Sequence, residues 1–250
     1  MTDMTEQAEG PPPAWALPAR LGVGLLQGGA FYALTEADGL AWAKDHPSLY
    51  GAALIVTAFV PAILLAGLGH LRRVTLAVWT LVATAVLAGL ALYSGGQIVP
   101  DQYGHSSETP GAALMLAGAG AVFIAHHLVA GADAERRLVA PYRTYFDTAW
   151  KHAVQLGLSL LFVGVFWLLL WLGAALFHLI GIIAFQDVLK EAWFHDPVLA
   201  MAFAAAVHLT DARASLTKGA RTLGLTLLSW LTPTMAVIVA EIGRAPCRER

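Results

Sequence analysis

Hydrophobic and charged positions are separated into long blocks along the chain, and seven stretches contain no Asp, Glu, Lys or Arg residue. A helix needs about 20 mostly apolar residues to cross a hydrocarbon core about 30 Å thick. Strands that cross membranes alternate apolar with polar residues, which these stretches do not, whereas a helix satisfies its own backbone hydrogen bonds in lipid. The pattern therefore predicts an all-α, polytopic transmembrane helical bundle with about seven spans. The stretches are 21–35, 46–71, 74–100, 109–132, 152–186, 197–210 and 222–240.

The first four spans have well-separated expected limits. We place them at about Trp15–Thr35, Ser48–Leu71, Val74–Tyr93 and Gly111–Ala130. Pro61 predicts a kink in the second span, because proline removes one helical hydrogen bond. Small residues give the fourth span a face that we expect to be buried between neighbouring helices; they are Gly111, Ala113, Gly118, Ala119 and Gly120.

The first three spans also show how they can pack. Span one is short unless Arg20 extends its guanidinium group toward the cytoplasm. It carries Gly24 and Gly28, a small-xxx-small spacing that lets two helices approach closely. Spans two and three are joined only through Arg72 and Arg73, which predicts a tight antiparallel hairpin.

The fifth charge-free stretch is too long for a single perpendicular span. Its 35 residues would form a helix about 50 Å long at 1.5 Å per residue. It must therefore tilt, break near Gly173 or Gly181, or end in a segment along the outer surface. We expect a span of about Ala153–Leu176 followed by an interfacial turn.

The sixth stretch is only 14 residues long. Asp196 as N-cap and Pro197 at the first helical position predict a sharp start for its helix. The helix can cross the membrane if Trp193 and Phe194 anchor one end. Alternatively, it enters the membrane and returns on the same side.

Basic residues occur almost entirely in every second gap between the spans. Ten lie on one side, and only Lys44 and Lys190 lie on the other. Because Lys and Arg are enriched in cytoplasmic loops, we expect the amino terminus in the cytoplasm and the loops near 36–47, 94–110 and 186–196 outside. The ten are Arg20, Arg72, Arg73, Arg136, Arg137, Arg143, Lys151, Arg213, Lys218 and Arg221.

Composition supports a membrane location. Hydrophobic residues make up 58% of the chain and charged residues 13%, against about 25% charged in an ordinary soluble domain.

The acidic, proline-containing head, 1–14, is not a cleavable signal peptide, and we expect a disordered cytoplasmic tail there. High Ala, Gly and Arg content is typical of a bacterial gene rich in G and C, which favours the bacterial inner (cytoplasmic) membrane.

The last ten residues, 241–250, interrupt an apolar helix with a cluster of charges. Their sequence, EIGRAPCRER, closely resembles the in-frame translation of a common sequencing-library adapter. We therefore expect one multi-span membrane domain over 15–240 that is incomplete at its carboxy end, followed by a non-native tail. The alternative is a genuine basic tail. Cys247, the single cysteine, lies in this segment and so indicates nothing about redox compartment.

The spans contain no zinc-protease, nucleophile-elbow, P-loop or dinucleotide motif, so we expect neither a catalytic residue nor a cofactor nor a metal. One polar cluster is expected at the inner face, where spans four, five and six end or begin. Its His and Asp residues suit a metal or an acid–base pair, and its basic residues suit a phosphate. The simpler interpretation, which we favour, is that these residues cap helices and contact headgroups; adjacent His126 and His127 are expected on different helix faces. The cluster comprises His126, His127, Asp147, Lys151, His152, His208, Asp211 and Arg213.

Three segments resemble a known family. They are YFDTAWKH at 145–152, which runs into the apolar stretch to 183, VHLTDARAS at 207–215 and LGLTLLSWLTP at 223–233. Over about 141–235 the chain resembles the bacterial inner-membrane family called domain of unknown function 4153. The resemblance implies a membrane location and this topology class, and its motif positions overlap the polar cluster. Family members typically continue beyond this length, and the family supplies no activity.

Three functions remain open. The first is a scaffold or accessory subunit of envelope processes, which fits the lack of motifs and the small, closely packing residues. The second is a permease or channel component for a small solute, and the third is an intramembrane enzyme acting on a lipid-linked or phosphorylated substrate. The expected partners are membrane lipid and other membrane proteins or a second copy of the chain, with no nucleic acid.

Overall fold

A computed structural model describes residues 12–95 and 112–212, together with the single positions 226, 229, 233 and 236. The chain divides into two units, Met1–Ala212 and Arg213–Arg250, and the first unit is the subject below. Several expectations lie outside the described residues: most of the head, the loop 96–111, the basic residues from Arg213 to Arg221, nearly all of the seventh stretch and the tail 241–250.

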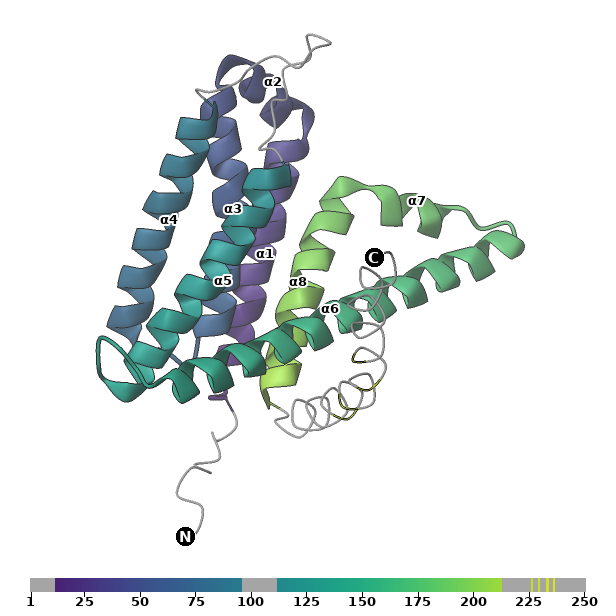
Figure 1. The fold of residues 1–250 in the computed structure, drawn as a ribbon. Coiled ribbons are helices and arrows are strands. Elements are labelled where there is room, and N and C mark those ends of the chain that lie inside the picture. Colours follow the sequence, from purple (N-terminus) through teal and green to yellow (C-terminus); the bar gives the residue numbers. More distant parts are fainter. Residues whose placement is uncertain are drawn as a thin grey trace, which may run out of the picture. The chain divides into compact units, whose positions relative to one another are not determined.

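Every regular element in the described part of the first unit is an α-helix, which confirms the all-α prediction. In Figure 1, α1, α3, α4 and α5 run side by side, and α6 crosses beneath them at a steep angle. The helices are α1 Ala16–Thr35, α2 Ala37–Asp45, α3 Pro47–Gly67, α4 Arg73–Gly95, α5 Ala112–Glu135, α6 Tyr142–Leu179, α7 Ala184–Lys190 and α8 Ala192–Ala212.

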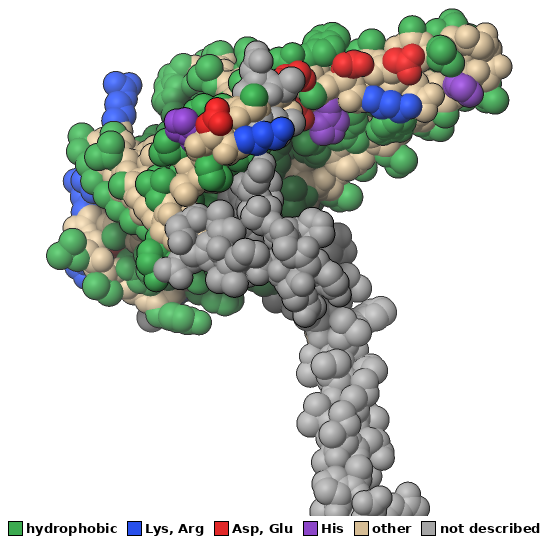
Figure 2. All heavy atoms as spheres, turned by 90° about the horizontal axis from the view of Figure 1, so that it is seen from above, with side chains coloured by type: hydrophobic (Ala, Val, Ile, Leu, Met, Phe, Trp, Pro, Cys, Tyr) green, Lys and Arg blue, Asp and Glu red, His purple; other side chains and the backbone are tan. Residues whose placement is uncertain are grey.

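Five of these helices are long and apolar enough to cross a membrane. Large apolar side chains such as Leu81 and Leu116 are about three-quarters exposed on their flanks, and Figure 2 shows hydrophobic side chains over much of the visible surface. These features indicate an integral membrane protein. The five helices are Pro47–Gly67, Arg73–Ser94, Leu114–Glu135, Tyr142–Leu179 and Ala192–Ala212.

Helix α1 is also about one bilayer long, but it is less apolar because it contains Arg20 and Gln27. It packs against α8 and α3. Its buried residues recur at every fourth position: Ala16, Arg20, Gly24 and Gly28. This stripe faces α8, so α1 directs its polar and small residues into the protein.

The small-xxx-small motif forms the centre of the contact between α1 and α8. A Cβ atom added to Gly24 would lie 2.8 Å from the carbonyl oxygen of Ala200, and one added to Gly28 would lie 2.5 Å from the carbonyl oxygen of Asp196. Both distances are shorter than van der Waals contact. The absence of side chains at Gly24 and Gly28 therefore allows the two backbones to touch, as the sequence motif predicts.

Helices α3 and α4 form the expected antiparallel hairpin across Arg72. Their packing includes Ala52 and Ile55 of α3 against Leu87 and Ala91 of α4. Helix α3 continues through Pro61 to its end at Gly67.

The expected small buried face of the fourth span is only partly correct. Gly118 of α5 is buried against the ring of Phe59, but Ala119 and Gly120 are exposed, and Gly111 and Ala113 lie outside the described side chains. The residue spacing on α5 does not select one face, so the rotation of the helix about its axis depends on its neighbours.

Helix α6 is one continuous helix of 38 residues, about 57 Å long at 1.5 Å per residue. It starts before the expected Ala153 and does not break at Gly173. It ends just before Gly181, which has a φ of +83°. The N–H groups of Gly181 and Ile182 donate hydrogen bonds to the carbonyls of His178 and Phe177, which is a Schellman C-cap. The expected break near Gly181 is therefore confirmed, and α6 runs at a steep angle to α1, α3, α4 and α5 (Figure 1).

The expected start of the sixth span is wrong, because α8 begins at Ala192 and contains Pro197. The carbonyl of Glu191 accepts hydrogen bonds from the N–H groups of Phe194 and His195, which closes a helical turn ahead of the proline. Proline is tolerated near the start of a helix, and the contact with Gly28 holds this turn against α1. The resulting 21-residue helix follows α1 along its length, which favours a full crossing over the re-entrant alternative.

The contact between α1 and α8 yields a direct test. Replacing Gly28 with Ala forces a methyl group into the backbone of α8, and overpacking of this kind lowers the free energy of unfolding by about 1–3 kcal/mol. Gly29→Ala is the matched control, since a Cβ atom there meets nothing within 4 Å. Titration of the protein in mixed micelles with a denaturing detergent measures both variants. Equal stability of the two variants would contradict the close contact.

Candidate functional site

Most polar side chains of interest lie at one end of the helices, here called the basic end. It is the end at which α1 begins, α3 is followed by α4, and α5 is followed by α6. Arg20, Arg72, Arg136 and Arg143 belong to it. The structure groups its buried polar residues into three sets that belong to different helix pairs.

The first set is the arginine–aspartate cluster, made by Arg20, His70, His208 and Asp211. One guanidinium nitrogen of Arg20 donates to Oδ2 of Asp211 at 2.8 Å and to the carbonyl of Leu68 at 2.8 Å. The other terminal nitrogen lies 3.3 Å from Nδ1 of His208. Nε2 of His70 lies 2.8 Å from Oδ1 of Asp211. The cluster therefore joins α1, α8 and the segment after α3.

Arg20 is enclosed by the protein rather than exposed at the end of α1. Its side chain is 0% exposed and that of Asp211 is 3% exposed. A buried guanidinium group is tolerated only when it is paired and hydrogen-bonded, because removing its water is expensive. The Asp211 carboxylate at the end of α8 provides that pairing, so Arg20 is held inside the protein.

The second set is the histidine cluster, made by His126 and His127 of α5 and His152 of α6. The three rings lie within 4.9–5.9 Å of one another, centre to centre. Nδ1 of His152 lies 3.0 Å from Nε2 of His127. Nδ1 of His127 contacts the carbonyl of Phe123. This arrangement fixes the tautomers, because a carbonyl only accepts: His127 donates to Phe123 and accepts from His152.

His126 is held from α4. Nε1 of Trp79 donates a hydrogen bond of 3.2 Å to Nδ1 of His126. An indole N–H only donates, so Nδ1 of His126 carries a lone pair and the proton of the neutral ring is on Nε2. That Nε2 atom is buried and has no hydrogen-bond partner among the described residues. The contribution of Trp79 was not predicted from the sequence, because its position along α4 does not indicate that it contacts α5.

The third set links α4 to α5. Asp133 accepts hydrogen bonds from the backbone N–H and the Nε of Arg72 and from the hydroxyl of Thr75, at 2.6–3.1 Å. Its side chain is nearly buried, whereas that of Arg72 is largely exposed. Sequence reasoning missed this pairing too. The only signal in the sequence was that Arg72 and Asp133 both border loops expected on the same side of the membrane.

The predicted polar cluster is therefore divided. His126, His127 and His152 come together, and His208 joins Asp211 about Arg20. His126 bonds to Trp79 of α4 and His127 to His152 of α6, so the two rings reach different helices as expected, although both line the same cavity. Asp147 is exposed and lies 3.8 Å from Arg143 on its own helix.

The described contacts assign neither Lys151 nor Arg213 of the predicted cluster to one of the three sets. Lys151 is half-buried beside His152 and interacts with its neighbours. Arg213 lies outside the described residues.

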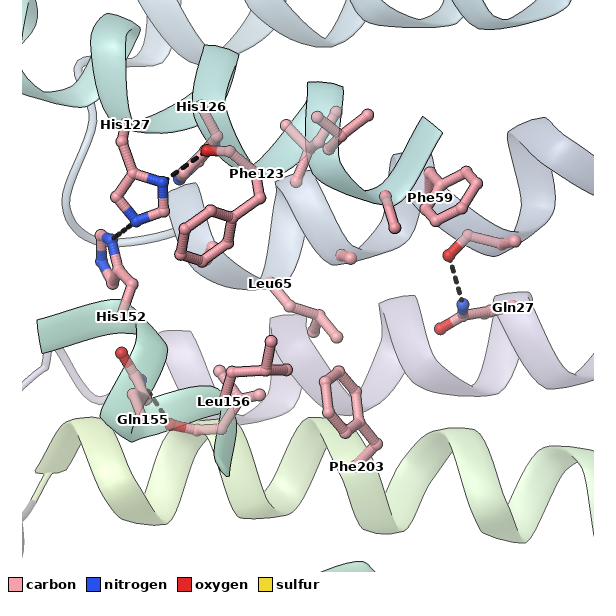
Figure 3. Close-up of a pocket in the computed structure, with 17 residues that line it drawn as sticks. Gln27, Phe59, Leu65, Phe123, His126, His127, His152, Gln155, Leu156 and Phe203 are labelled. Atoms are coloured by element: carbon pink, nitrogen blue, oxygen red, sulfur yellow. Dashed lines mark hydrogen bonds between the residues drawn. The ribbon is translucent and has the colours of Figure 1, made fainter. Parts of the chain in front are cut away.

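A cavity of about 340 Å³ lies between the helices next to the histidine cluster. Figure 3 shows His126, His127 and His152 at one end and Gln27 at the other, with Phe203 and Leu156 along one side. The remaining lining is mostly apolar and comes from α3, α5, α6 and α8. Among the residues that the structure describes, no Asp, Glu, Lys or Arg side chain lines it.

Two glutamine side chains form hydrogen bonds between the helices that line the cavity. Gln27 donates a hydrogen bond of 3.1 Å to the carbonyl of Thr57, which joins α1 to α3. Gln155 donates one of 3.2 Å to the carbonyl of Val207, which joins α6 to α8. Such interhelical hydrogen bonds stabilise helix association in lipid. They leave the cavity with polar groups at its edges and an apolar middle.

In the described part of the chain, no group of three or more His, Cys, Asp or Glu side chains is arranged to hold a metal ion. The hydrogen bond between His127 and His152 uses nitrogens that a metal would need. Of the two basic residues expected to suit a phosphate, Lys151 already interacts with its neighbours and Arg213 lies outside the described residues.

Comparison with known proteins adds no relative: no protein-family model, no curated protein and no solved structure matches the chain. The candidate site is therefore interpreted from its geometry alone.

The arginine–aspartate cluster predicts unequal effects of two similar substitutions. Asp211→Asn leaves the Arg20 charge buried without its counterion, and breaking a buried pair in this way lowers the free energy of unfolding by about 3–5 kcal/mol. Asp147→Asn weakens an exposed pair with Arg143, and such a pair is worth about 0–1 kcal/mol. Denaturing-detergent titration of the two variants measures both values. A small effect of Asp211→Asn would show that Arg20 does not depend on it.

Proposed function

We propose that the protein is a non-catalytic scaffold or accessory subunit of envelope processes in the bacterial inner membrane. The observation that carries the proposal is how the charged groups of the candidate site are used. Arg20 of α1 pairs with Asp211 of α8, and Asp133 of α5 pairs with Arg72 in the segment between α3 and α4. The enclosed pair of Arg20 and Asp211 fixes the positions of its two helices, and the nearly buried Asp133 carboxylate ties α5 to the connection before α4.

The membrane topology is part of this proposal. We infer seven spans with a cytoplasmic amino terminus: α1, the five apolar helices and the stretch 222–240. Support comes from the distribution of basic residues, since Arg72, Arg136 and Arg143 all belong to the basic end, whereas Lys44 and Lys190 belong to α2 and α7 at the opposite end. Positive residues are retained in the cytoplasm, so the basic end is the inner one.

We also propose membership of the bacterial inner-membrane family called domain of unknown function 4153. Its support is the resemblance of 145–152, 207–215 and 223–233 to family segments. Among those positions, His152, His208 and Asp211 are residues that link helices in the first unit. A structural role for these positions is consistent with a family that supplies no activity.

A ligand-binding function is the second candidate, and the cavity beside the histidine cluster favours it. Its mostly apolar lining does not suit a path for a hydrated solute, which requires polar groups throughout. An enzyme acting on a phosphorylated substrate is disfavoured, because the cavity lacks a basic side chain. The partners proposed are membrane lipid and other membrane proteins or a second copy of the chain.

Complementation of a deletion strain tests the scaffold proposal. The gene is returned with Asp147→Ala, His208→Ala or Asp211→Ala, and membrane abundance is measured by immunoblot. We expect Asp147→Ala to restore the wild-type phenotype fully, and the two buried-site variants to fail only in proportion to lost abundance. Loss of the phenotype at normal abundance would contradict a scaffold and indicate a site that acts on a substrate.

Cysteine labelling tests the orientation. In a Cys247→Ser background, Leu138→Cys at the basic end and Ile180→Cys at the opposite end of α6 are both well exposed. A membrane-impermeant maleimide is expected to label Ile180→Cys in intact spheroplasts and Leu138→Cys only after lysis. The reverse pattern would place the amino terminus outside.

A further inference from the structure

We propose that the cavity between α3, α5, α6 and α8 binds an uncharged membrane amphiphile whose hydroxyl group is held by His126 and His152. The proposal goes beyond a scaffold role and does not depend on it. It starts from the one buried histidine nitrogen in the described residues that has no partner, Nε2 of His126.

The state of His126 follows from its neighbour. Because Trp79 donates to Nδ1, the ring must be neutral and must carry its hydrogen on Nε2. His126 is 4% exposed and lines the cavity. An unmet donor in such a site loses its hydrogen bonds to water without replacement. A ligand oxygen in the cavity would restore the missing bond.

His152 supplies the complementary group. Its Nδ1 is used in the hydrogen bond with His127, which leaves Nε2 as an acceptor. No hydrogen bond to this Nε2 is present among the described residues, and His152 also lines the cavity. The rings of His126 and His152 lie 5.9 Å apart, centre to centre. One end of the cavity thus offers a donor and an acceptor to the same small head group.

A hydroxyl group matches this pair, because it donates one hydrogen bond and accepts others. A charged head group does not match, since the cavity wall contains no charged side chain to pair with it and burial of an unpaired charge is expensive. The rest of the cavity is lined by side chains such as Phe59, Phe123 and Phe203, which suit a hydrocarbon body. The volume of about 340 Å³ is at the lower end of the range of ~300–1,000 Å³ found for ligand sites.

Photolabelling with two matched probes tests the proposal. The first probe is a 14-carbon alcohol that carries a diazirine and a terminal alkyne, and the second has the same chain without the hydroxyl group. Both are added to the full-length protein in lipid nanodiscs, and labelled peptides are mapped by mass spectrometry. We expect the alcohol to label cavity-lining peptides saturably and about tenfold more strongly than the hydrocarbon, which is the effect of one buried hydrogen bond.

Three variants separate the contributions. His126→Phe is expected to lower labelling by the alcohol toward the level of the hydrocarbon, because the donor is lost while the acceptor of His152 and the apolar lining remain. Ala119 lines the cavity at an exposed edge, so Ala119→Phe obstructs the cavity without changing a histidine and is expected to abolish labelling of cavity peptides by both probes. Val78→Phe, on the exposed flank of α4, is the control that leaves labelling unchanged.

Equal labelling by the alcohol and the hydrocarbon would overturn the proposal, since the cavity would then accept only acyl chains. Full labelling of the His126→Phe variant by the alcohol would also overturn it. If size-exclusion chromatography shows that His126→Phe does not fold, Ala119→Phe decides: alcohol labelling that persists in this variant places the label outside the cavity and rejects the site.

Discussion

A buried ion pair between the first and the last described helix is the interaction on which the arrangement depends. Arg20 is completely enclosed, and its nearest counterion, Asp211, is 2.8 Å away. In a low-dielectric environment either charge alone would cost several kcal/mol. Pairing them requires the start of α1 to lie beside the end of α8, and the contacts of Gly24 and Gly28 bring the two backbones together along the way. Helix α1, which is less apolar than the other long helices, is therefore held between α3 and α8.

The polar groups of the basic end have two distinct roles that follow from their surroundings. Where a charged group is buried, as at Arg20 and Asp133, it is paired across helices and stabilises their positions. Where neutral histidines meet beside a cavity, hydrogen bonds from Trp79 and to Phe123 set their tautomers and leave one donor without a partner. The charged groups therefore use their main interactions within the protein, whereas the histidine cluster keeps a hydrogen-bond donor available to a ligand.

Much of the helical arrangement could be predicted from the sequence, because charge-free stretches and the short charged segments between them determine where long apolar helices begin and end. The limits of α1 and the hairpin of α3 and α4 agree well with expectation. The prediction that the helix starts at Pro197 was wrong. Packing against Gly28 and the turn closed by the carbonyl of Glu191 extend α8 by five residues, so that it begins at Ala192. The depth of the candidate site was also predictable. Its division into clusters was not, because the rotation of each helix decides that His152 faces inward and Asp147 outward.

A double-mutant cycle on Arg20 and Asp211 tests the central interaction most directly. The free energy of unfolding is measured in mixed micelles for the wild type, Arg20→Met, Asp211→Asn and the double variant. If the pair holds α1 against α8, each single variant is strongly destabilised and the double variant is no less stable than either one, which gives a coupling energy of about 2 kcal/mol or more. Additive effects, with a coupling energy near zero, would show that the two charges are buried independently and would contradict the account.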